Sequence, residues 1–245
     1  MKERLHLLDT LRGWTLLHMI AYHGLWNLVY LYHVKMDWYT GTLGYVWQQS
    51  ICWTFILLSG FCWSMSRSHW KRGALVFAGG LAVSLVTHVA MPSAAINFGI
   101  LTFLGSAMLL MIPLEKGLKK VPAVPGLLAS SMLFCLLRNL GGGTFGFESL
   151  VLGRVPKGLY RNMLTAYLGF PPKSFRSTDY FALFPWLMLF VAGYFLYRIL
   201  HSRGWDRTLF AKGEIPCLTF LGKHSLLVYL LHQPLLYGLM ALCFQ

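Results

Sequence analysis

Four side chains that could do chemistry lie inside the first long apolar segment of the chain, residues 7–32. They are Asp9, Arg12, His23 and Asn27. At ~100° per residue, the spacing from Arg12 to His23 returns a helix to within ~20° of the same direction, so the four share one stripe, whereas His18 falls on another face. Charged groups at membrane depth are expensive and usually functional. The stripe therefore predicts a functional site, the alternative being buried polar groups that satisfy one another.

The composition identifies the class of protein. The 245 residues are 56% hydrophobic and only 12% charged, about half the charged fraction of a soluble domain. We therefore expect one polytopic transmembrane domain over residues 1–245, without a cleavable signal. The net charge of +13 lies in loops between apolar runs, so it reflects topology and indicates no nucleic-acid partner.

Hydropathy predicts an all-α bundle of about seven transmembrane helices. The expected spans are 7–32, 48–66, 73–91, 97–113, 124–140, 180–199 and 217–242. With the N-terminus in the cytoplasm, most Lys and Arg residues of the short loops fall inside, as the positive-inside rule requires. An odd number of spans then places the C-terminus outside.

One outer segment does not follow the charge rule. Residues 141–179 carry five cations: Arg154, Lys157, Arg161, Lys173 and Arg176. Either this loop folds back onto the bundle, or it serves an anionic ligand. Its apolar piece 159–170 is too short to span, which favours a re-entrant or interfacial segment.

This topology predicts two levels of polar residues. At the outer level we expect groups from five spans: His23, Asn27, His33, His88, Asn97, Asp179 and His232. At the inner end we expect a basic mouth: Arg12, Lys71, Arg72 and Lys223.

A histidine near an acid or amide is the usual general base, and burial favours its neutral, proton-accepting form.

A zinc site is disfavoured because acidic ligands are few and HExxH is absent, and the five cysteines lack metal-ligand spacing. Ser59 is the one candidate serine nucleophile, although its Ser59-Gly60 pair more simply permits close helix packing.

Several motifs resemble those of known membrane acyltransferases. They are the Arg12-to-His23 spacing after Leu8-Asp9-Thr10-Leu11, the stretch 53–61 and the stretch 221–234. Within that superfamily, 97–105 and 177–187 are most similar to the heparan-α-glucosaminide N-acetyltransferase-like branch. The resemblance covers nearly the whole chain.

The resemblance implies transfer of an acetyl group from cytosolic acetyl-CoA, across the membrane, to a sugar amine or hydroxyl. The functional Asn and His of that branch match His23 and His33 here, so His23 departs from the branch and agrees with the wider superfamily. Either His23 or His33 is then the base, with preference for His23, and Asn97 or Asp179 orients the acceptor or the histidine.

The CoA phosphates would bind the basic mouth, where Arg suits bidentate contacts. Arg12, Arg67, Lys71, Arg72, Lys223 and His232 are the expected donor-binding residues, and no metal is expected. A bacterial plasma membrane is the expected location.

A different class of function stays open: a small transporter or flippase for a glycolipid, in which buried His and Arg relay protons or bind a head group. A purely structural membrane subunit is disfavoured by the intramembrane Arg and His. The sequence does not decide the acceptor sugar, N- against O-acetylation, direct transfer against an acyl-enzyme, or the oligomeric state, for which a homodimer is one option.

Overall fold

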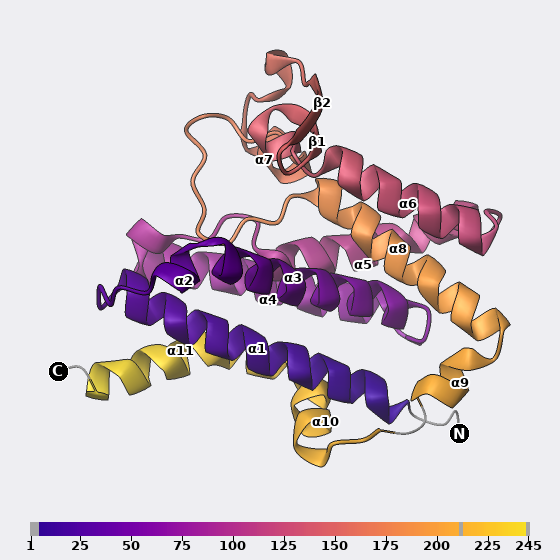
Figure 1. Cartoon of the computed structure of the whole chain (residues 1–245), viewed down its shortest axis with the longest axis horizontal. Helices are drawn as coiled ribbons and strands as arrows, with labels where there is room; N and C mark the ends of the chain where they lie inside the picture. Colours follow the sequence, from indigo (N-terminus) through magenta and orange to yellow (C-terminus); the bar gives the residue numbers. More distant parts are fainter. Residues whose placement is uncertain (1–4, 211–212, 244–245) are drawn as a thin grey trace. The chain divides into compact units, whose positions relative to one another are not determined.

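A computed structural model describes residues 5–210 and 213–243 of the chain, which are mostly helical (Figure 1). The long helices occupy the expected spans: α1 (His6–Tyr30), α3 (Thr42–Trp63), α4 (His69–Ala90), α5 (Ile100–Leu118), α6 (Ala123–Leu137), α8 (Leu183–Ser202), α10 (Pro216–Lys223) and α11 (Ser225–Cys243). The short elements are α2 (Asp37–Thr40), η1 (Pro92–Ala94), η2 (Leu140–Gly142), β1 (Thr144–Phe147), β2 (Leu150–Arg154), η3 (Lys157–Leu159), α7 (Met163–Leu168) and α9 (Trp205–Phe210).

Five helical segments of the described residues are long and apolar enough to cross a membrane. They are α4, α5, α6 with η2, α8 and α11. Helices α1 and α3 are also long enough, at 25 and 22 residues, but polar side chains reduce their hydropathy. A mostly helical membrane protein is thus confirmed, and the count of seven spans stays a prediction.

Two local features differ from the sequence expectation. The last expected span, 217–242, is divided into α10 and α11 by His224, whose backbone leaves the helical region. The segment 141–179 contains an antiparallel hairpin of β1 and β2, which was not predicted. Gly146 permits it, because a Cβ there would lie 2.0 Å from the carbonyl oxygen of Leu150.

Contacts divide the chain into two units, each described by itself below. Unit 1 is formed by residues up to Leu58 and from Leu200 onward, and unit 2 by Ser59–Ile199. The core of unit 1 packs Leu16 and Met19 of α1 against Ile51 of α3, with Val228 and Tyr229 of α11 around them.

The first and last helices of unit 1 run side by side in the same direction. Near the start of α1, Thr10 contacts Thr219 of α10. Further along, His23 contacts Gln233 of α11. Contacts therefore advance along both segments together, and α1 is parallel to α10–α11.

Unit 2 is built on the antiparallel pair α4 and α5. Two glycines bring the helices together: a Cβ at Gly80 would lie 2.4 Å from the backbone nitrogen of Thr102, and one at Gly105 equally close to that of Phe77. Helix α8 supplies most of the remaining core, including the fully buried Phe190. Gly60 lies against the Phe190 carbonyl, where a Cβ would be 2.0 Å away, so the predicted packing role of the Ser59-Gly60 pair is supported.

Candidate functional site

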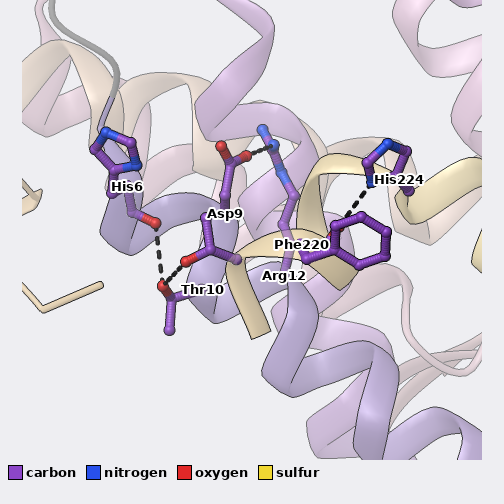
Figure 2. Close-up of polar contacts among 7 residues, drawn as sticks. His6, Asp9, Thr10, Arg12, Phe220 and His224 are labelled. Atoms are coloured by element: carbon purple, nitrogen blue, oxygen red, sulfur yellow. Dashed lines mark hydrogen bonds and ion pairs between the residues drawn. The ribbon is translucent and has the colours of Figure 1, made fainter. Parts of the chain in front are cut away.

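Close helix packing places a charged pair at the beginning of the α1/α10 contact. Arg12 donates from Nη1 to Oδ1 of Asp9 over 2.7 Å, and Figure 2 shows the guanidinium directed at that carboxylate. The Asp9 side chain is only 7% exposed and that of Arg12 is 20% exposed. A buried ion pair of this kind holds both charges in a fixed geometry.

Glycines allow α10 to approach this turn of α1. A Cβ at Gly13 would lie 1.8 Å from the Leu218 carbonyl oxygen, and one at Gly222 1.8 Å from the Asp9 carbonyl oxygen. The hydroxyls of Thr10 and Thr219 meet at 2.7 Å.

Two further basic side chains follow Gly222 directly. Lys223 ends α10, and His224 bonds through Nδ1 to the Phe220 carbonyl (Figure 2). Both are exposed. We refer to Asp9, Arg12, Lys223 and His224 as the Arg12 cluster. It combines the partly buried Asp9–Arg12 ion pair with two exposed basic groups, which suit an anion.

A second cluster of polar residues lies further along α1, where this helix contacts α11. His23 accepts at Nδ1 from the Gln233 side-chain amide over 3.1 Å, and Gln233 accepts at Oε1 from Asn27 over 3.3 Å. The rings of His23 and His232 have centroids 5.0 Å apart. These four residues form the histidine cluster. Asn27 is fully buried and His232 nearly so, and the ring contact places His232 beside His23, as the prediction of a shared level requires.

The backbone fixes the tautomer of His232. Its Nδ1 contacts the carbonyl oxygen of Tyr229, which can only accept, so the proton of the neutral ring is on Nδ1. Nε2 is then left with a lone pair. It is buried and has no hydrogen-bond partner among residues 5–210 and 213–243, and the same is true of Oδ1 of Asn27. Unpaired buried acceptors are rare and cost about 1–3 kcal/mol each.

The Arg12 cluster and the histidine cluster lie far enough apart along α1 for an extended ligand to contact both. Arg12 and His23 both belong to α1, and eleven residues of α-helix rise by ~16 Å. A ligand anchored by a charged end at the Arg12 cluster could present a reactive group of its other end to His232 Nε2.

The structure separates His33 from this arrangement. His33 lies in the loop beyond the end of α1, with a backbone φ of 55° and an exposed side chain. His18 also lies apart, as its position on another face of the helix predicted, and accepts at Nδ1 from Nε1 of Trp47 over 3.0 Å. Of the histidines of α1, only His23 joins the histidine cluster.

Asn97 and Asp179 belong to two segments of unit 2 that hydrogen bonds hold together. Oδ2 of Asp179 accepts from the backbone N–H of Ile100, the first residue of α5, over 3.1 Å. Asn97 donates from its side chain to the Arg176 carbonyl over 2.9 Å, and Ser177 bonds to its backbone. Two motifs 80 residues apart in sequence are thereby tied together.

The environment of Asp179 also changes its acidity. Burial raises the pKa of this carboxyl to about 6, an effect that the hydrogen bond from Ile100 partly opposes. The contacts support a role in holding two loops. The expected orienting role of Asn97 and Asp179 stays a prediction.

The remaining expected donor-binding residues also belong to unit 2. Arg67 precedes α4, and Lys71 and Arg72 lie in its first turn, all three exposed. The guanidinium of Arg198 donates to the carbonyls of Leu118 and Val121, both over 2.9 Å, and so caps the end of α5.

Sequence reasoning overlooked Gln233 and the carbonyl of Tyr229. Gln233 follows His232 directly in the stretch 221–234, so its place beside a buried histidine was a usable signal. The carbonyl of Tyr229 carries no side-chain signal, because any residue at that position offers the same acceptor.

Comparison with known proteins adds one match. The family model described as heparan-alpha-glucosaminide N-acetyltransferase, catalytic, matches residues 4–234. No curated protein and no solved structure matches the chain. The apolar helices and this family together indicate an integral membrane protein. Since the match spans most of the 245 residues and both helical units, the chain belongs to the heparan-alpha-glucosaminide N-acetyltransferase catalytic-domain family of membrane N-acetyltransferases.

Proposed function

We propose that this protein transfers an acetyl group from cytosolic acetyl-CoA to an amine or hydroxyl of a sugar on the outer side of the membrane. The observation that carries the proposal is the buried, unpaired Nε2 of His232, beside His23 and ~16 Å along the helix from the Arg12 cluster. Family membership supports the acetyl transfer.

The Arg12 cluster would hold the phosphates of the donor. Arg12 keeps its charge at any physiological pH and presents a planar set of donors that matches phosphate oxygens. Lys223 and His224 adjoin it from the end of α10. Arg67, Lys71 and Arg72, which belong to unit 2, stay proposed as donor-binding residues. The pantetheine arm would then run along α1 to the histidine cluster.

At the histidine cluster, His232 would act as the general base. Its Nε2 lone pair takes the proton from the acceptor amine or hydroxyl as that atom bonds to the acetyl carbonyl carbon. The bond from this carbon to sulfur breaks, and the sulfur takes the proton from Nε2 of His232 and leaves as the CoA thiol. His23, held by Gln233, would position the acetyl group. We propose His232 as the base because its tautomer leaves the free acceptor on Nε2, and the sequence-based preference for His23 stays a prediction.

The parallel course of α1 and α11 supports transfer across the membrane. Two parallel spans require an odd number of spans between them, and α3, α4, α5, α6 and α8 provide that number. The basic inner loops then orient the N-terminus to the cytoplasm and the C-terminus outside. We propose this seven-span topology in a bacterial plasma membrane.

Purified protein in lipid nanodiscs tests the function directly. We expect release of CoA thiol from acetyl-CoA to depend on added glucosamine, and we use glucose as the matched acceptor that offers hydroxyls alone. Acetylation of glucosamine without acetylation of glucose indicates N-transfer, and formation of acetylglucose shows O-transfer. Movement of either sugar into sealed vesicles without consumption of acetyl-CoA would instead show a transporter.

A further inference from the structure

Exposed apolar and basic side chains are concentrated in the segment between α6 and α8. Six apolar side chains lie on it: Leu150, Val151, Leu152, Leu159, Met163 and Leu164. Three exposed cations lie among them in sequence: Arg154, Lys157 and Arg161. We refer to these nine residues as the hairpin surface. Leu152 and Leu164 are 64% and 68% exposed, which is costly for leucine in water.

Other residues of this segment are buried or hydrogen-bonded and hold it in place. Val155 and Ala166 are buried. The Tyr160 hydroxyl donates to the Leu140 carbonyl over 2.6 Å, and Asn162 and Thr165 form a capping box for α7. The exposed side chains therefore project from an ordered support and not from a loose loop.

The charges on the hairpin surface have no internal partner. Glu148 is the sole acidic residue in 141–178, and it pairs with Arg138 at 3.5 Å. None of Arg154, Lys157 and Arg161 forms a salt bridge with another residue of the described chain. The surface is thus apolar and uniformly positive.

We propose that the hairpin surface docks on the anionic phospholipids of the membrane. Apolar side chains would enter the boundary of the acyl chains while Lys and Arg contact lipid phosphates. The segment joins α6 to α8, both apolar enough to span, so it starts and ends at a membrane surface. A second copy of the chain fits less well, because a two-fold contact would bring the same three cations together.

Hydrogen–deuterium exchange of the full protein in nanodiscs tests this contact. The probes are phosphatidylglycerol in phosphatidylcholine, against phosphatidylcholine alone. Since each cation near an anionic surface contributes roughly a fivefold effect, we expect exchange across 148–165 to slow at least ~10-fold with phosphatidylglycerol. Equal exchange in both lipids would overturn the proposal. So would protection that rises with the number of protein copies per disc, which indicates a second copy.

Two sets of variants make the test specific. Arg154→Gln, Lys157→Gln and Arg161→Gln together should abolish the effect of phosphatidylglycerol on 148–165. The matched control removes the same charge elsewhere in unit 2, by Lys116→Gln, Lys119→Gln and Lys120→Gln together. This control should keep the effect of phosphatidylglycerol on 148–165. Leu152→Asn with Leu164→Asn should reduce protection in both lipids. Unchanged exchange in α4 and α5 shows that each variant is folded, and a folded basic-residue variant that behaves like the parent overturns the proposal.

Discussion

The α1/α10 pair and the α4/α5 pair use the same packing device for different purposes. In each, two glycines allow backbone contact across the helices. Between α1 and α10, however, polar groups bond from one helix to the other, as Thr10 does with Thr219. Between α4 and α5 they bond within their own helix, as Ser106 does with the Thr102 carbonyl over 2.7 Å.

This difference separates a site from a scaffold. Polar groups satisfied within one helix leave the helix contact to apolar packing, which stabilises α4/α5. Where α1 packs against α10 and then α11, polar groups bond to the neighbouring helix or have no partner among the described residues. Acceptors such as Nε2 of His232 on α11 are then left for a ligand. We therefore expect substitutions in the two pairs to affect turnover and stability differently.

The largest difference is expected for polar side chains. His232→Ala should lower turnover by ~10²–10⁴-fold, because the proton acceptor is lost, and His23→Ala should lower it less. Binding of acetyl-CoA, measured by calorimetry, should persist in both. Ser106→Ala in the α4/α5 pair is the matched control and should keep normal turnover. Near-normal turnover of His23→Ala and His232→Ala, or a comparable loss with His33→Ala, would contradict the assignment.

The next largest difference in turnover is expected between Gly222→Ala in the α1/α10 pair and Gly105→Ala in the α4/α5 pair. Gly222→Ala forces α10 away from the Asp9 carbonyl, and a shift of ~1 Å at a site can cost ~10²-fold in rate. Gly105→Ala should instead lower the melting temperature through overpacking, while the folded fraction keeps its turnover. Thermal unfolding and specific activity of both variants measure this. Equal behaviour of the two would remove the distinction between site and scaffold.

Substitutions of cations should have smaller effects than those of the glycines. Arg12→Lys keeps the pair with Asp9 charged but loses the planar donor set. Loss of a hydrogen bond to a charged group costs about 1.5–3 kcal/mol, so the KM for acetyl-CoA should rise by ~10–100-fold. Arg72→Ala should also raise KM more than it lowers kcat, whereas Lys120→Ala should change neither. An unchanged KM in both arginine variants would rule out the proposed phosphate site.

The smallest effect concerns pH. The raised pKa of Asp179, about 6, means that the folded protein binds this proton more tightly than the unfolded chain, whose Asp pKa is about 3.9. The resulting stabilisation is complete below about pH 4 and is lost as pH rises through about 6. Asp179→Asn should remove up to ~2–3 kcal/mol of this pH dependence. Melting temperatures between those pH values, compared with the parent, measure it; parallel curves would contradict it.

The sequence predicted the long helices and the part of the histidine cluster that belongs to α1. Hydropathy located the long helices, and helical periodicity placed His23 and Asn27 together and His18 elsewhere. These are properties of one segment and its period. The partners required tertiary information, because Gln233 lies 206 residues beyond Asn27. Hydropathy also could not show that His224 interrupts the last span or that Gly146 permits a hairpin, since both depend on local backbone geometry.

The pairing of α1 with α10 and α11 also has a consequence for biogenesis. About two hundred residues separate the members of each cluster, as the separation of 210 between His23 and Gln233 shows. While the ribosome is still making the intervening helices, α1 carries only half of each cluster. With the site that we propose, a nascent chain cannot transfer acetyl groups until α11 has been made and packs beside α1.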